Sequence, residues 1–81
     1  MENNEFAILH TLSTGQFLVD TTYEHDTDEL KLSFKFWASN INGYATMTLS
    51  WTEDKEADFI KTFNKFKSVE FCENWVKKIN Q

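Results

Sequence analysis

Nucleophilic chemistry in this chain would depend on its one cysteine, Cys72, activated by His10 or His25. A histidine beside a cysteine can accept the thiol proton and leave a reactive thiolate. Cys72 shares a predicted helical face with Val69 and Val76, and a free cysteine in such a place usually packs as a small hydrophobic residue. We therefore expect an inert thiol, with a minimal thiol-dependent enzyme as an alternative.

The stretch EHDTDE, residues 24–29, carries side chains that could hold a cation: His25, Asp26, Asp28 and Glu29. A calcium loop of the EF-hand type needs a central glycine and a distant final glutamate, and that order is absent. Zinc usually takes four nitrogen or sulfur ligands, whereas the chain has two histidines and one cysteine. The stretch therefore predicts a solvated acidic turn with no metal; a minimal metal-dependent enzyme is the alternative.

Other catalytic signatures are missing from the chain: there is no P-loop, GxGxxG, GxSxG or HExxH motif. With only two glycines, a phosphate-binding loop is nearly excluded. All eight basic residues are lysines, so the bidentate guanidinium that reads phosphate or guanine is lacking. We predict that the protein is not an enzyme and needs no cofactor.

The net charge of −5 is concentrated in the first part of the chain. Residues 20–29 contain five acids and no lysine. An acidic balance argues against direct nucleic-acid binding and against binding to anionic membranes. The acidic run could instead dock a basic partner, or it could only keep a turn soluble.

The length of 81 residues predicts a single domain, residues 1–81. Eight Phe, three Trp and two Tyr supply a large buried area for so short a chain. No apolar run approaches the ~20 residues of a membrane span, and the start MENNEF does not resemble a secretion signal. A single cysteine cannot form an internal disulfide, so a cytoplasmic location is expected.

The clearest structural signal is Asn42-Gly43, followed by the alternating stretch YATMTLSW. Asn-Gly is typical of a two-residue type I′ hairpin turn, because both residues tolerate positive φ. With that turn, Ile41 lies opposite Tyr44. Apolar residues then face one another along one side of the hairpin: Ala38 and Met47, Phe36 and Leu49, Phe34 and Trp51.

A second hairpin is predicted upstream, where residues 6–12 and 16–23 flank the turn Ser13-Thr14-Gly15. In this register Leu12 lies opposite Phe17. The inward face would carry Phe6, Ile8, His10, Leu12, Phe17, Val19 and Tyr23. The alternative is a short helix from an Asn4 cap through Leu12, since Phe6, Leu9 and Leu12 also have helical spacing. We favour the strands.

After Trp51 the apolar period becomes helical. One stripe contains Phe59, Ile60, Phe63 and Phe66, with Ser50 or Thr52 as its cap. Ser68 can cap a second helix, whose stripe contains Val69, Cys72, Trp75, Val76 and Ile79. The sequence therefore predicts an α+β fold: a small antiparallel β-meander of about four strands with two C-terminal helices packed on one face.

Two helices can cover only one face of such a sheet, so the other face should be exposed. It would carry Trp37 with Lys35 and Tyr44, and also Leu9 and Leu18. Trp and Tyr dominate binding hot spots, because they bury large area at low entropic cost. We predict a partner-binding site at Trp37, Tyr44 and Lys35, with Asp26, Asp28 and Glu29 as its electrostatic rim. The alternatives are that the N-terminus folds over this face or that it closes a homodimer.

A small, acidic, aromatic-rich chain without catalytic motifs resembles in kind the small inhibitor proteins. These include antitoxins, toxin-immunity proteins and phage-encoded blockers of bacterial defence such as anti-CRISPR proteins. The resemblance implies a non-catalytic inhibitor or regulator that occludes a site on a larger protein or nucleoprotein, for example a basic nucleic-acid-binding cleft. The resemblance assigns no role to any individual residue of this chain. An alternative from a different functional class is that the protein is a subunit of a homo-oligomeric structural assembly.

Overall fold

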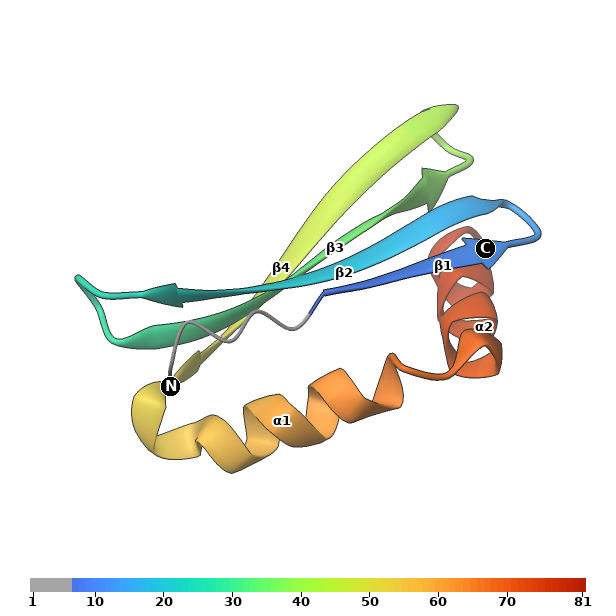
Figure 1. The fold of residues 1–81 in the computed structure, drawn as a ribbon. Helices are drawn as coiled ribbons and strands as arrows, with labels where there is room; N and C mark the ends of the chain where they lie inside the picture. The colour runs from blue at the N-terminus through green and yellow to red at the C-terminus, as the bar shows by residue number, and fades with distance from the viewer. Residues whose placement is uncertain (1–6) are drawn as a thin grey trace.

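The computed structural model, which describes residues 7–81, is a four-stranded antiparallel sheet followed by two helices (Figure 1). The strands are β1 (Ile8–Leu12), β2 (Gly15–Glu24), β3 (Glu29–Ala38) and β4 (Gly43–Thr52), and they lie in the order β1-β2-β3-β4. A short 3-10 turn (Glu53–Lys55) leads into α1 (Glu56–Lys65), and α2 (Val69–Ile79) follows. The predicted α+β meander with two C-terminal helices on the sheet is confirmed.

The core lies between one face of the sheet and the two helices. Alternate residues of β2 and β3 point into it, as the period of a strand requires, and most of them are fully buried: Phe17, Val19, Leu30, Leu32 and Phe34. The helical segments contribute Phe59, Phe63, Phe66, Cys72 and Val76. Three residues of the predicted stripes, Ile60, Val69 and Ile79, are exposed instead, so each helix buries a narrower face than its apolar pattern suggested.

Phe66, the C-cap residue of α1, anchors the junction between the two helices. Its ring stacks on Phe17 at 5.9 Å between centroids and lies 4.5 Å from Phe34. Trp75 of α2 meets the Phe66 ring edge-on at 5.6 Å. Ser68 caps α2 as predicted, because its side chain accepts a hydrogen bond from the backbone N–H of Phe71. The predicted cap of α1 is wrong, since neither Thr52 nor Lys55 makes a side-chain cap bond.

The first hairpin consists of strands, as we favoured over the helix, but its register differs from the predicted one. His10 lies opposite Phe17 and Leu12 opposite Gly15. The turn is therefore tighter than expected, and Gly15 adopts a φ of 134° that other residues rarely take. The shift is an even number of residues, so the side chains keep their predicted faces. Phe6 and Asn4 lie outside the described residues.

The turn of the second hairpin differs from the predicted one. Asn42-Gly43 does not form a two-residue type I′ turn; residues 39–42 form a four-residue loop in which only Asn42 has positive φ, at 51°. Backbone bonds from Ile41 N to Ala38 O and from Asn42 N to Ser39 O hold this loop. Ala38 therefore lies opposite Gly43 rather than Met47.

The new register also pairs Trp37 with Tyr44, Phe34 with Met47 and Leu30 with Trp51. It is displaced by four residues from the predicted one, again an even number, so both faces keep their predicted residues. The loop is further fixed by Asn80 after α2, whose side chain bonds to Trp37 O at 3.1 Å and to Ser39 N at 3.0 Å.

Substitutions at Asn42 and Gly43 distinguish the two turns. We expect Asn42→Val to lower the free energy of unfolding by about 1–3 kcal/mol, because a β-branched residue is strained at positive φ. Gly43→Ala should be neutral within about 0.5 kcal/mol, as at an ordinary surface position, since an added Cβ meets only Ile41 O at 3.8 Å. Urea denaturation measures both. A large loss of unfolding free energy from Gly43→Ala would instead support the type I′ turn that the sequence predicts.

Candidate functional site

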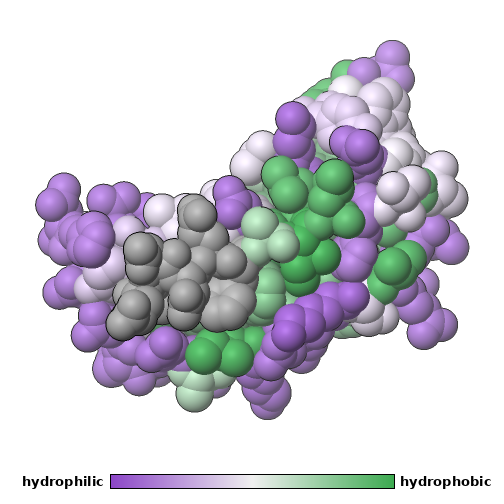
Figure 2. Space-filling model, viewed as in Figure 1, coloured by the Kyte–Doolittle hydropathy of each residue, from purple (hydrophilic) through white to green (hydrophobic). Residues whose placement is uncertain are grey.

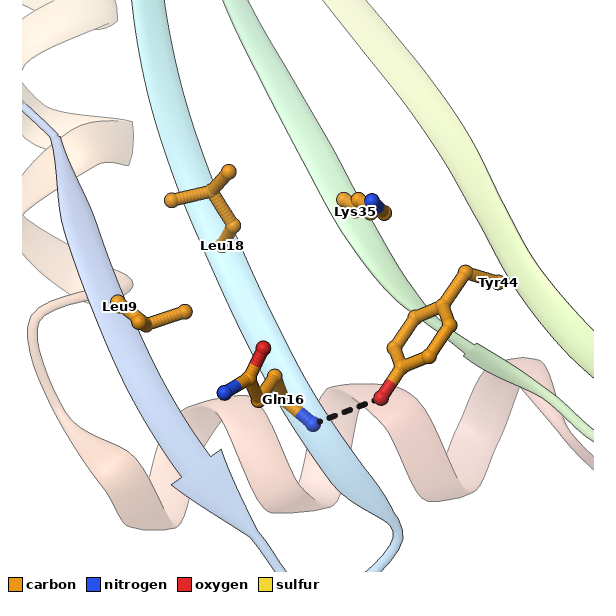
Figure 3. Close-up of a pocket in the computed structure, with 5 residues that line it drawn as sticks. All are labelled: Leu9, Gln16, Leu18, Lys35 and Tyr44. Atoms are coloured by element: carbon orange, nitrogen blue, oxygen red, sulfur yellow. Dashed lines mark hydrogen bonds between the residues drawn. The ribbon is translucent and has the colours of Figure 1, made fainter.

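The candidate site lies on the face of the sheet opposite the helices, which we call the open face. Three predicted site residues meet there: Lys35 and Trp37 from β3 and Tyr44 from β4. Figure 3 shows Lys35 and Tyr44 near Leu9, Gln16 and Leu18, with the helices behind the sheet. Leu9 is 60 % exposed and Tyr44 45 % exposed. The structure therefore brings the predicted aromatic and cationic residues together.

Leu9 gives this face an apolar margin along β1. Figure 2, viewed as in Figure 1, shows hydrophobic surface in the middle of the visible side, where β1 runs, bordered by hydrophilic side chains. Exposed hydrophobic residues that occur singly are common. Here Leu9 and Leu18 line the same shallow pocket as Tyr44, so the apolar atoms are contiguous.

Tyr44 occupies the centre of this group. Its ring meets Trp37 edge-on, with 5.6 Å between the ring centroids and 84° between the planes. The Lys35 ammonium lies 5.6 Å from the Tyr44 centroid, a cation–π contact that contributes about 0.5–1 kcal/mol at exposed sites. The Tyr44 hydroxyl accepts a hydrogen bond from Gln16 N at 3.3 Å. These contacts hold an exposed aromatic side chain in one orientation.

Tyr44 reaches β2 because the two hairpins separate at this end. The pairing of β2 with β3 stops at Leu18 and Lys35, and Figure 1 shows the β3–β4 hairpin diverging from β1 and β2 beyond that point. Gly15 gives the phenol room, since an added Cβ would lie 2.9 Å from the Tyr44 hydroxyl. The side chain thus bridges the gap between the hairpins.

The pocket beside Tyr44 is small. It has a volume of about 120 Å³ and is lined by Leu9, Gln16, Leu18, Lys35 and Tyr44. Pockets that bind cofactors or drug-sized ligands usually have volumes of about 300–1,000 Å³. The pocket beside Tyr44 is below this range, and its lining combines two leucines with the polar side chains of Gln16 and Lys35.

The acidic residues predicted as a rim lie elsewhere. Asp26 and Asp28 are in the turn between β2 and β3, and Glu29 begins β3. This turn is at the opposite end of the sheet from the β3–β4 loop (Figure 1). Glu29 and Lys35 are six residues apart on one strand, or about 20 Å at the usual rise per residue. The structure therefore does not place the acidic residues around the aromatic group.

Asp28 has a structural role that sequence reasoning missed. It takes a φ of 53° in the turn, and its carboxylate accepts a hydrogen bond of 2.6 Å from the Tyr23 hydroxyl. Glu53 also lies 2.7 Å from that hydroxyl. The two carboxylates raise the pKa of Tyr23 above its usual value. The Asp28 bond spans only the β2–β3 turn, whereas the Glu53 contact joins residues 30 positions apart and no local pattern encodes it.

The candidate nucleophile is buried and engaged in the core. Cys72 has no exposed surface, and its thiol donates to Phe66 O at 3.3 Å. His10 Nε2 lies 2.9 Å from the same carbonyl, so the two side chains share an acceptor and do not form an acid–base pair. Burial raises the pKa of the Cys72 thiol to about 11, which keeps it protonated at neutral pH.

His25 packs edge-on against Tyr23, with 4.8 Å between the ring centroids. Within residues 7–81, no group of three or more His, Cys, Asp and Glu side chains is arranged to hold a metal ion. In the same part of the chain, no helix combines the length and the apolar character needed to cross a membrane.

Comparisons of the chain with protein-family models, with curated proteins and with solved structures give no match.

The environment of Cys72 predicts its reactivity. We expect the native thiol to resist 5,5′-dithiobis(2-nitrobenzoate) at neutral pH, because it is buried and protonated. In denaturant, one thiol per chain should react. Rapid labelling of the folded protein would contradict this description and would return Cys72 to the list of candidate nucleophiles.

Proposed function

We propose that the protein is a non-catalytic binding module that inhibits or regulates a larger protein by covering one of its surfaces. The centre of contact is the group of Lys35, Trp37 and Tyr44 on the open face, with Leu9 and Leu18 beside it. The observation that supports this most directly is the pre-ordered aromatic pair. Trp37 and Tyr44 pack edge-to-face while Tyr44 stays 45 % exposed.

Pre-ordering matters because association costs side-chain entropy. An exposed tyrosine that is already held by Gln16, Lys35 and Trp37 loses less freedom on binding than a mobile one. Aromatic anchors surrounded by weaker polar contacts are typical of binding hot spots. On this face the surrounding side chains include exposed Gln16, Thr46 and Thr48, which can form such a polar rim.

The acidic residues have a different task in this proposal. Asp26 is exposed in the turn at the far end of the sheet, and the chain carries a net charge of −5. Charges outside a contact area act mainly on the rate of encounter. The target is accordingly a protein or nucleoprotein with a basic surface, such as a nucleic-acid-binding cleft. The inhibitor types named above, acting in the cytoplasm, fit this description.

A binding experiment tests the aromatic centre. The wild-type protein and Trp37→Ala are compared as baits, and the partner that is recovered is then purified for surface plasmon resonance. We expect Trp37→Ala to weaken binding by about 2 kcal/mol or more, mainly through faster dissociation. Thr22→Ala, on the same face but away from the aromatic group, is the control and should bind like the wild type.

The same variants separate binding from stability. Trp37→Ala should unfold at lower denaturant than the wild type but should lose less than Phe36→Ala, whose buried ring is worth about 3–5 kcal/mol. Unchanged dissociation for the folded Trp37→Ala variant would remove this residue from the interface.

Reversing the charge at Asp26 tests the acidic turn without breaking the bond between Tyr23 and Asp28. We expect Asp26→Lys to slow association with the partner at low salt and to have little effect at high salt, because screening removes long-range steering. Dissociation should not change. Glu70→Lys makes the same charge change on α2 and serves as the control. Equal association rates for both variants would show that the turn has no special part in steering.

A further inference from the structure

The strand β4 has an unpaired outer edge. It pairs with β3 through ten consecutive residue pairs, from Gly43 to Thr52, and no other strand of the described residues pairs with it. The N–H and C=O groups along such an edge are a template for another strand. The opposite edge differs, because β1 has only five residues. Ser13, in the turn after β1, also donates two hydrogen bonds to the carboxylate of Glu73 in α2.

The usual protection of an edge strand is missing from β4. Natural proteins block such edges with lysines, prolines or bulges. The sequence of β4, GYATMTLSWT, contains no charged residue and no proline, and its register with β3 is continuous, without a bulge. The other strands of the sheet that exceed five residues, β2 and β3, both carry charged side chains.

The apolar side of β4 is incompletely covered. Leu32 and Phe34 of β3 have no exposed surface, whereas Leu49 of β4, which lies opposite Leu32, is 37 % exposed. Ala45, Met47 and Trp51 on the same side of β4 are only partly buried. The helices therefore leave the outer row of the sheet partly open to solvent, most of all at Leu49, and an added strand would cover part of it.

We infer that β4 pairs antiparallel with β4 of a second copy of this chain, so that the two sheets join into one. A twofold axis through Thr48 brings Met47 opposite Leu49 of the second copy, and Ala45 opposite Trp51. It also places Thr46 opposite Ser50. Apolar residues then meet apolar residues, and Thr46 meets Ser50 in a hydroxyl pair that is favourable across strands.

Charge favours a second copy over a charged peptide. Each chain has a net charge of −5, which opposes association in general, but β4 contributes none of that charge. Two copies can therefore approach along β4 without placing like charges directly opposite. A charged peptide would find no charge on this edge to select it.

Edge pairing leaves the open face available. Joining two sheets in one plane places both copies of the Lys35–Trp37–Tyr44 group on the same side of the dimer. The inference does not rest on the proposed function, since a dimer could form whether or not that face binds a partner.

Sedimentation velocity on the pure protein over a wide concentration range tests the inference. We expect the wild type to reach twice the chain mass of 9.6 kDa at high micromolar concentration. Thr48→Lys should remain monomeric, because it puts two lysines opposite each other at the axis. Thr11→Lys makes the same change at an exposed position of the other edge strand and should still dimerise. Circular dichroism checks that both variants are folded.

A cysteine at the axis tests the register. Thr48→Cys should form an intermolecular disulfide under mild oxidation, because two residues at a twofold axis of an antiparallel pair have their Cα atoms about 4.5–5.5 Å apart. Thr11→Cys should not, and Cys72 is buried in both proteins. A wild type that stays monomeric at every concentration would overturn the inference. The edge of β4 would then be expected to pair with a strand of another protein. A dimer that survives Thr48→Lys, or that Thr48→Cys does not cross-link, would overturn this pairing.

Discussion

The carbonyl oxygen of Phe66 is the point on which the arrangement of helices and sheet depends. It belongs to the C-cap residue of α1, at the end where helical carbonyls lose their partners, and the Phe66 ring is buried. A buried carbonyl without a hydrogen bond would destabilise the fold by several kcal/mol. His10 from β1 and Cys72 from α2 both lie within hydrogen-bonding distance of it. One polar group thereby links the first strand, the helix junction and the last helix.

This link determines which parts of the chain are left for function. Cys72 and His10, whose side-chain types could in principle do nucleophilic chemistry, instead satisfy a backbone group in the core. Because the aromatic cluster around Phe66 holds both helices on one side, the open face receives no cover from them. The exposed side chains around Tyr44 are consequently aliphatic, amide and hydroxyl groups with Lys35 near the centre.

The faces of the sheet could be predicted from the sequence, but the registers could not. Alternation assigns Phe34, Trp37 and Tyr44 to faces, and that assignment survives any even shift of register. The prediction of a two-residue turn at Asn42-Gly43 was wrong, because the preference of this dipeptide competes with a longer loop that Asn80 holds from a distant segment. The same limit applies to the contact between Tyr23 and Glu53, and to that between Gln16 and Tyr44, which exist only once the strands are placed.

The corrected register is also what gives the candidate site its geometry. In the predicted hairpin, Tyr44 lay opposite Ile41, at the tip of the sheet and away from Trp37. The longer loop moves Tyr44 opposite Trp37, close enough for the ring to span the gap where β2 leaves β3 and to reach Gln16. Gly15 leaves space beneath it, because an added Cβ there would lie 2.9 Å from the Tyr44 hydroxyl. The separation of the hairpins thus opens a gap that Tyr44 bridges, and the bridge keeps an exposed aromatic ring in place.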